Sequence, residues 1–334
     1  MRREATLKSI RRESEYVPYN IELTSEELTK VADYAGIDKA GFFDWAGNHI
    51  EKCSYNIGGK MVKPGYFQDE YGVVWNRRGL DKDIGVVDGI LIPDADLSVY
   101  HFPDPDLDAV RLTTEKFISN GKDTLKFGKI GMTYYERAWS LTGMENLLMD
   151  FVLEPEFVDD LFDRILQYNL KIIDAAVTYD IDGFYFGDDY GQQNGMIMGP
   201  ETWRRFIKPG LAVMIERVKS AGKIAALHSC GNISDILRDL IDIGLDIYQT
   251  VQPEIYDLKK LKTEYGKDLS FWGAISTQRL LPFATPAELT AVTRDTISIM
   301  GMGGGYIAGP THQAPADVPA ENIIALIEAF KSWN

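Results

Sequence analysis

The amino-acid sequence predicts an α/β protein folded as a (β/α)8 TIM barrel, with an N-terminal helical extension and loop insertions. In the second half of the chain, short runs of β-forming residues alternate with amphipathic helical patterns. This alternation is typical of parallel strands joined by helical crossovers. Polar residues follow almost every one of these runs. Many polar strand ends favour a barrel, whose strands end on one common face, over the narrower crevice of a doubly wound sheet.

The β-rich runs can be placed by residue number. They cover 125–135, 183–189, 223–231, 246–251, 269–275 and 304–310. Apolar residues recur at helical spacing over 157–178, in segments that stop near Gly222 and Gly244, and in a final helix through Ile323, Leu326, Ile327 and Phe330. Thr285 and Glu288 flank Pro286 in the pattern of a capping box, which predicts the start of another helix.

Residues 44–105 differ from the rest of the chain. They are rich in Gly, Pro, Asp and aromatic residues and show little periodicity, so we expect an insertion or long loops over a pocket. No linker, low-complexity tract or short repeat separates two halves. We therefore expect residues 1–334 to form a single barrel domain, in which residues 1–124 are the loop-rich part.

The composition is that of a globular enzyme with an acidic surface. The 334 residues are 45% hydrophobic and 25% charged, with a formal net charge of −15. Phosphate backbones and anionic lipid would repel such a surface, so nucleic-acid and membrane binding are disfavoured. The charged N-terminus has no apolar targeting segment, and two Cys cannot form a disulfide framework, so we expect a cytoplasmic protein.

The stretch "LHSCGN" places His228 and Cys230 at one predicted strand end, although the chain has only four His and two Cys. Residues two apart on a strand face the same side, so both side chains could share a pocket if the strand continues through them. Imidazole nitrogen and thiolate sulfur are ligands that zinc prefers, and a catalytic zinc usually has three protein ligands. His312 follows another predicted strand and is the candidate third ligand. The alternative is that this His and Cys simply pack at a strand end.

Carboxylates, amides and aromatic rings follow other predicted strands. Asp188 and Asp189 end one run and are the candidate catalytic groups, although side chains of adjacent extended residues point to different sides. Either could instead cap the segment that follows. The candidate substrate-binding residues are Tyr135, Trp139, Tyr190 and Gln252. The alternatives are core or rim packing for the aromatic rings and helix capping for the amide.

Several long stretches resemble the uroporphyrinogen decarboxylase superfamily. They are "FGDDYGQQNGMIMGPETWRRFIKPGLAVMI", "LRDLIDIGLDIYQTVQPE", the region 271–330 and the N-terminal "REATLKSIRRESEYVP". The resemblance is dense from about residue 125 to the end and implies a (β/α)8 barrel. The arginine- and glycine-rich N-terminal motif of the true decarboxylases is missing, and "YVPYNIEL" stands near its place. The His-x-Cys pair is similar to that of the cobamide (corrinoid)-dependent methyltransferase branch, where a distant Cys completes a zinc site. His312 stands near the place of that Cys.

The resemblance implies a zinc-dependent methyltransferase that moves a methyl group between a small methylated substrate, such as a methoxylated aromatic, and a corrinoid protein. Asp188 or Asp189 would orient a substrate hydroxyl or deliver a proton, and the aromatic rings would hold the substrate. The corrinoid is expected on a partner protein, because nothing in the chain resembles a cobalamin-binding domain. Two alternatives stay open: a cofactor-free decarboxylase or lyase acting on a carboxylated substrate, with His312 and Asp188 as acid and base, and a non-catalytic barrel that binds a corrinoid or small molecule. Assembly into a homo-oligomer also stays open.

Overall fold

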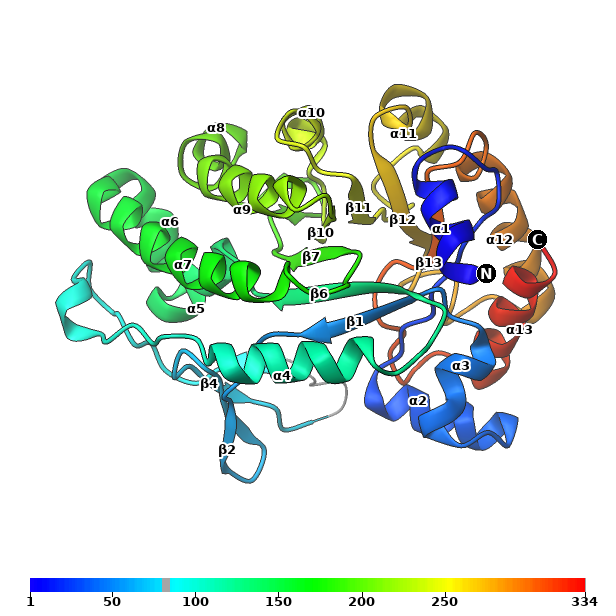
Figure 1. The fold of residues 1–334 in the computed structure, drawn as a ribbon, viewed down its shortest axis with the longest axis horizontal. Coiled ribbons are helices and arrows are strands. Elements are labelled where there is room, and N and C mark those ends of the chain that lie inside the picture. Colours follow the sequence, from blue (N-terminus) through cyan, green and yellow to red (C-terminus); the bar gives the residue numbers. More distant parts are fainter. Residues whose placement is uncertain (80–84, 334) are drawn as a thin grey trace.

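One curled parallel sheet organises the protein, as the computed structural model shows for residues 1–79 and 85–333 (Figure 1). The order of its seven strands is β1-β6-β7-β10-β11-β12-β13, and each strand runs parallel to its neighbours. The strands are β1 (Ile50–Ser54), β6 (Leu125–Gly131), β7 (Gly183–Gly187), β10 (Ile224–His228), β11 (Ile247–Thr250), β12 (Ser270–Ile275) and β13 (Tyr306–Pro310). Because all seven strands run parallel, their carboxyl ends lie at the same edge of the sheet.

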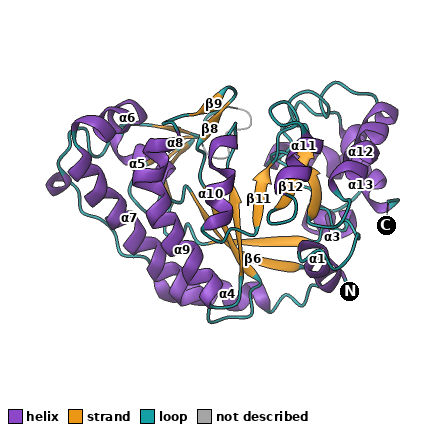
Figure 2. Ribbon diagram, turned by 90° about the horizontal axis from the view of Figure 1, so that it is seen from above, coloured by secondary structure: helices purple, strands orange, loops and turns teal. Residues whose placement is uncertain are grey.

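Helices cover the outer side of this sheet (Figure 2). The covering helices are α4 (Leu107–Ile118), α5 (Tyr135–Thr142), α6 (Met144–Leu153), α7 (Pro155–Ala176), α8 (Pro200–Thr202), α9 (Lys208–Ser220), α10 (Leu237–Asp242), α11 (Leu258–Tyr265), α12 (Pro286–Met300) and α13 (Ala320–Lys331). Every residue of β7, β12 and β13 is buried, as expected for parallel strands with side chains packed on both faces. The predicted strand and helix alternation is confirmed, and Thr285 and Glu288 form the predicted capping box at the start of α12.

The chain before β1 joins the two outer strands of the sheet. The backbone N–H of Asn20 donates to the carbonyl of Ala308 in β13 (2.9 Å), and the N–H of Ala308 donates to the carbonyl of Pro18 (2.8 Å). On the other side, the N–H of His49 donates to the carbonyl of Tyr19 (3.1 Å), next to the start of β1. Residues 17–23 therefore lie between the two edge strands and satisfy backbone groups of both.

The N-terminal helix α1 (Arg2–Ile10) packs against the amino ends of the strands. Its Leu7 and Ile10 belong to a buried cluster with inward-facing strand residues such as Ile50, Leu125 and Ile247. The guanidinium of Arg3 donates to both carboxylate oxygens of Asp182 at distances of 2.6 to 3.1 Å. This helix thus covers the end of the sheet opposite to the carboxyl ends of the strands.

The structure shows an inserted sheet within 44–105, where we expected an insertion or long loops, and it adds two features that the sequence pattern did not predict. Strand β1 lies inside this region and escaped detection because "IEKCS" carries two charged residues in five. Four further strands, β2 (Lys60–Lys63), β3 (Tyr66–Gln68), β4 (Val74–Asn76) and β5 (Val86–Val87), form an antiparallel sheet. Residues 80–84 of this region lie outside the described residues. The remaining helices are α2 (Ser25–Ala35) and α3 (Phe42–Ala46).

A buried arginine ties the antiparallel sheet to α5. The side chain of Arg137 is only 2% exposed, and its guanidinium lies 2.6 Å from the carboxylate of Asp69 and 3.0 Å from that of Glu70. Asp69 also accepts hydrogen bonds from the backbone of Tyr71 and Val73 and from the indole of Trp75. The insertion is therefore held at a fixed position by charge-assisted hydrogen bonds that water does not screen.

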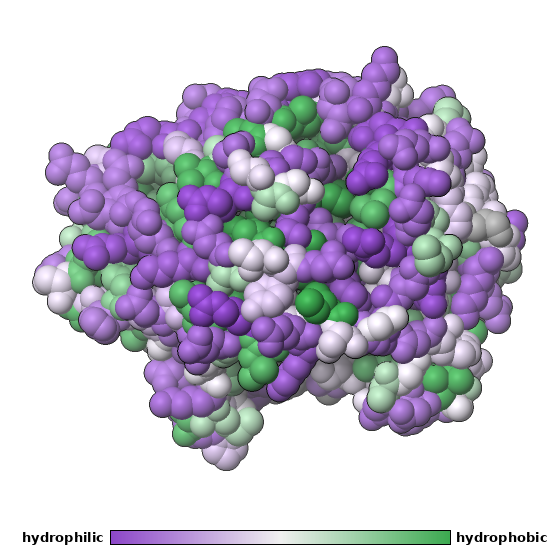
Figure 3. Space-filling view, viewed as in Figure 1, coloured by the Kyte–Doolittle hydropathy of each residue, from purple (hydrophilic) through white to green (hydrophobic). Residues whose placement is uncertain are grey.

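The outer surface is predominantly hydrophilic on the face shown in Figure 3, with apolar side chains scattered in small groups. Among the described residues, no helix combines the length and the apolar character needed to cross a bilayer.

We expect Arg137→Met to lower the free energy of unfolding by about 3 to 5 kcal/mol, because two buried carboxylates lose their counter-charge. Urea denaturation measures this change. The matched control is Arg217→Met, which removes an ion pair with Asp174 whose arginine side chain is 43% exposed, and which should cost under about 1 kcal/mol. Equal losses in the two variants would contradict the anchoring role of Arg137.

Candidate metal centre and its cavity

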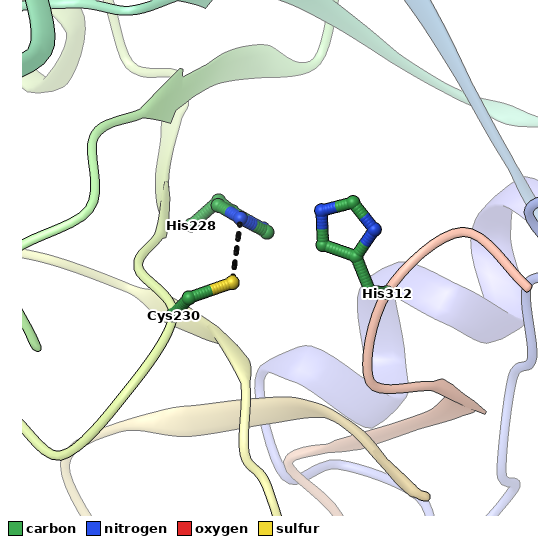
Figure 4. Close-up of side chains that lie close together, drawn as sticks. All are labelled: His228, Cys230 and His312. Atoms are coloured by element: carbon green, nitrogen blue, oxygen red, sulfur yellow. Dashed lines mark hydrogen bonds between the residues drawn. The ribbon is translucent and has the colours of Figure 1, made fainter. Parts of the chain in front are cut away.

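Two histidines and a cysteine come together at the carboxyl ends of β10 and β13 (Figure 4). One potential ligand atom from each of His228, Cys230 and His312 lies within 4.8 Å of the others. His228 is the last residue of β10, and its Nε2 lies 3.5 Å from the sulfur of Cys230. His312 follows β13 by two residues, and its ring centre lies 5.5 Å from that of His228. The structure thus brings together the three residues that the sequence predicts as metal ligands.

Cys230 reaches this position from a loop rather than from the strand, since β10 stops at His228. The carboxylate of Asp189 accepts the backbone N–H of Cys230 (2.8 Å), and the side-chain oxygen of Gln252 accepts that of Gly231 (2.7 Å). Gly231 has φ +78°, and a Cβ there would lie 2.2 Å from the backbone of Gly191. Only glycine fits this left-handed, crowded position, so the turn depends on its missing side chain.

Gln249 of β11 orients His228 and also contacts the loop that carries His312. Its side-chain oxygen accepts hydrogen bonds from Nδ1 of His228 and from the hydroxyl of Tyr185 (2.8 Å). Its amide nitrogen donates to the carbonyl of Thr311 (3.2 Å), the residue before His312. Because an amide oxygen only accepts, Nδ1 of His228 carries the proton and Nε2 is left free as a ligand.

The donor set and its spacing fit zinc. With Zn–N and Zn–S bonds of about 2.1 and 2.3 Å, two tetrahedral ligands lie about 3.6 Å apart, close to the 3.5 Å between Nε2 of His228 and the sulfur of Cys230. Burial lowers the pKa of His228 to about 4, so its imidazole is neutral at pH 7. Burial, followed by the charges of Asp189 and Glu136, raises the pKa of the Cys230 thiol. A bound cation would reverse this shift and favour the thiolate.

A cavity of about 450 Å³ lies beside this cluster. His228, Gln249 and His312 line one side of it, and Phe67 and Trp75 of the insertion line another. The lining also includes nine charged residues: Glu22, Lys52, Asp69, Glu70, Arg77, Lys129, Glu136, Arg137 and Asp189. The cavity is therefore a polar chamber that extends from the candidate metal centre to the insertion.

The two candidate catalytic aspartates have different surroundings. Asp188 is fully buried, and its carboxylate accepts the backbone N–H groups of Tyr135 (2.9 Å) and Glu136 (2.8 Å) at the start of α5. Burial raises the pKa of Asp188 to about 6. Asp189 lines the cavity, and its carboxylate lies 3.4 Å from Nε2 of His228. The structure thus gives Asp188 a capping position and Asp189 a position at the site.

Within the described part of the chain, the predicted substrate-binding residues lie outside the lining of the cavity. Tyr135 and Tyr190 are fully buried, and the rings of Trp139 and Trp75 lie 6.3 Å apart in an edge-to-face contact. Gln252 holds the loop at Gly231. A substrate-binding role for these four residues stays a prediction.

Sequence reasoning missed several residues that line the cavity. Lys52 was missed because β1 was not recognised, and Glu22 lies in the segment that joins the edge strands. Lys129 is a charged residue inside a predicted strand, and this pattern could have identified it as a candidate from the sequence alone. Gln249 and Gln252 both stand near the end of one predicted strand, and residue type alone does not distinguish their roles.

Glu136 lines the cavity, and the pKa of its carboxyl group is raised. Burial, followed by the nearby charges of Asp189 and Asp188, raises its pKa well above 4.5. A carboxyl group in these surroundings keeps its proton to higher pH than an exposed one, so it can act as an acid or as a hydrogen-bond donor.

The shifted pKa of Glu136 predicts a pH-dependent stability. Below pH 4.5 this carboxyl is protonated in both the folded and unfolded states. As the pH rises, it ionises first in the unfolded state, so the free energy of unfolding falls until the folded-state pKa is passed. Glu136→Gln should remove this loss and become more stable relative to wild type at pH 8 than at pH 4.5, measured by urea denaturation. The control Glu145→Gln, at an exposed position of α6, should show no such change.

The fold and the cluster define an α/β protein with a candidate metal centre at the carboxyl ends of its parallel strands. The chain belongs to the uroporphyrinogen decarboxylase (URO-D) family, because residues 106–333 match the family model. A solved methyltransferase from Methanosarcina mazei has the same fold, with a TM-score of 0.73 and 19% identity, over 99% of this chain and 98% of that one.

Relatives within the family include methyltransferases and decarboxylases. The chain is 26% identical over 291 residues to methylcobamide:CoM methyltransferase MtaA of Methanosarcina barkeri, covering 83% of this chain and 74% of that protein. It is 25% identical over 198 residues to a methylated-thiol–coenzyme M methyltransferase of Methanosarcina mazei, covering 58% of this chain and only half of that protein. Identity to uroporphyrinogen decarboxylase of Coxiella burnetii is 20% over 184 residues, covering 54% and 49%. The predicted resemblance to the methyltransferase branch is confirmed.

Proposed function

We propose that this protein is a zinc-dependent methyltransferase that moves a methyl group between a small methylated substrate and a corrinoid carried by a partner protein. The cluster of His228, Cys230 and His312 at the end of a polar cavity carries the proposal. The methyltransferases among the relatives support it. A decarboxylase would need no such nitrogen and sulfur cluster.

We also propose that residues 17–23 act as the eighth strand of a closed (β/α)8 barrel within one domain. Their backbone hydrogen bonds to Ala308 of β13 and to His49 before β1 support this assignment. Closure would leave no free edge on the parallel sheet and would fix the spacing between β13, which carries His312, and β1.

His228, Cys230 and His312 would hold the zinc ion through two nitrogens and one sulfur and leave a fourth position open to substrate. Zinc in this position supplies a Lewis acid that stabilises negative charge on a bound thiol or on an oxygen that loses its methyl group. Gln249 keeps Nε2 of His228 aimed at the site. Asp189 holds the backbone of Cys230 and lies beside His228, where it can orient a polar group of the substrate. Glu136 holds a proton that can pass to a departing oxygen.

A methoxylated aromatic compound is the substrate class that we propose. Phe67, Trp75 and Tyr185 line the cavity and offer ring faces and edges for stacking. In this proposal these rings contact the substrate, and Tyr135, Trp139 and Tyr190 lie outside the lining residues of the cavity. The volume of about 450 Å³ is enough for a single-ring compound.

The metal content of anaerobically purified protein tests the proposal. Wild type should hold about one zinc per chain, and both Cys230→Ser and His312→Ala should lose zinc, since each removes one of three ligands. Cys53→Ser is the matched control, because Cys53 is buried in β1 apart from the cluster and should leave the zinc content unchanged.

Activity is measured next with methoxylated aromatic compounds and free cob(I)alamin as the methyl acceptor. Wild type should form methylcobalamin, and the two zinc-deficient variants should not. Folded wild-type protein without zinc, even after reconstitution, would contradict the metal mechanism and would direct the assays to decarboxylation. Zinc loss in Cys230→Ser alone would place His312 in the substrate pocket instead of among the ligands.

The contact between Gln249 and His228 predicts a graded effect on metal affinity. Gln249→Leu should weaken zinc binding by about 10- to 100-fold, because the imidazole loses the partner that fixes its tautomer and orientation. Chelator competition measures the affinity. Tyr185→Phe removes the other hydrogen bond to the same amide oxygen but leaves His228 held, so its effect should be clearly smaller.

A further inference from the structure

Lys129 places a positive charge inside the cavity, away from the candidate metal centre. It lies on β6, where residues two apart face the same side, so it points inward like Phe127 and Gly131. Its partner in the β6–β7 register is Tyr185, whose ring also lines the cavity. The ammonium group thus lies in the barrel interior and not at the outer surface.

Most other charges around the cavity are already matched. The ammonium of Lys52 lies 2.5 Å from the carboxylate of Glu22, and Arg137 pairs with Asp69 and Glu70. For Lys129, by contrast, the described residues provide no ion pair within 4.0 Å and no side-chain hydrogen bond. Burial, followed by the charge of Lys52, lowers the pKa of Lys129. The carboxylates of Glu22 and Glu136 partly oppose this shift, and a negatively charged ligand at Lys129 would stabilise the ammonium further.

Two glycines that line the cavity lie near Lys129. Gly131 follows it by two residues on β6, and Gly187 is the register partner of Gly131 on β7. A Cβ at position 131 would lie 3.7 Å from Cε of Lys129 and 3.4 Å from the side-chain oxygen of Asn56. A Cβ at position 187 would lie 3.5 Å from the Cα of Gly131. Larger side chains at these positions would fill the space between the lysine and the mouth of the cavity.

We propose that Lys129 binds an anionic group of the substrate, so that the substrate class is an aromatic carboxylic acid with a methoxy group. This deepens the proposed function, although the anion site itself does not depend on methyl transfer. Strand β7 separates β6 from β10, and the register places His228 level with Gly131, two residues beyond Lys129, so the backbones at Lys129 and His228 lie about 12 Å apart across the sheet. A single-ring acid fits between the two side chains with its carboxylate at Lys129 and its methoxy group toward His228. A cationic methylammonium compound would be repelled by the same lysine.

Isothermal titration with 3-methoxybenzoate and its neutral analogue 3-methoxybenzamide tests the inference. Wild type should bind the acid at least about tenfold more tightly than the amide, because only the acid makes a charge-assisted contact. Lys129→Met keeps an unbranched side chain that is one atom shorter and uncharged, and it should lose this preference. Lys129→Arg keeps the charge and should retain most of it. Equal affinities in wild type, no binding of either probe at millimolar concentration, or an unchanged preference in Lys129→Met would each overturn the inference.

The same titration in Cys230→Ser separates this inference from the proposed function. A carboxylate could bind a metal ion instead of a lysine, and in that case the preference for the acid would disappear in Cys230→Ser and persist in Lys129→Met. This result would overturn the anion site and leave the metal centre intact. A preference that persists in Cys230→Ser and depends on Lys129 would support the anion site, even if neither zinc nor methyl transfer were found.

Discussion

The parallel pairing of β10 with its neighbours is the constraint on which the site depends. Register pairs His228 of β10 with Gly187 of β7 and with Gln249 of β11, so the imidazole has a glycine on one side and an amide on the other. The glycine leaves room for the cavity, and the amide holds the ring. A shift by one residue would turn His228 away from the interior and would break its contact with Gln249. Strand register therefore determines both the position of the His228 imidazole and the room for the cavity beside it.

The sequence predicts the parts of the fold whose patterns are strong and local. The strands at 183–187 and 270–275 are uniformly buried, and the helix-start signal at Thr285 is a local hydrogen-bond motif, so both could be recognised from residue types. Strand β1 could not, because its inward-facing Lys52 is stabilised by Glu22, which lies 30 residues earlier in the chain. When only neighbouring residues are considered, a lysine whose partner lies so far away in the chain resembles a solvent-exposed residue.

The candidate site could likewise be predicted from residue types only in part. His228, Cys230 and His312 could be proposed because rare residue types at strand ends are visible in the sequence. The roles of Asp188 and Gln249 could not be assigned, because they depend on which atoms a side chain meets: Asp188 meets the backbone at the start of α5, whereas Gln249 meets an imidazole. The aromatic residues chosen from the sequence pack in the core, and the rings at the cavity include two from the insertion, where periodicity is weak.

The cavity has two walls of different origin. One wall consists of strand ends and carries the candidate metal ligands, while the other comes from the antiparallel sheet that Arg137 anchors. The antiparallel sheet lies between β1 and α4 in the chain and contributes none of the three candidate ligands. Substitutions in this sheet can therefore leave the candidate metal centre unchanged, provided that Asp69 and Glu70 retain their ion pairs with Arg137. Changes in this wall would alter the part of the cavity that the insertion forms, while the strand residues of the lining, Lys129 among them, would stay in place together with the candidate ligands.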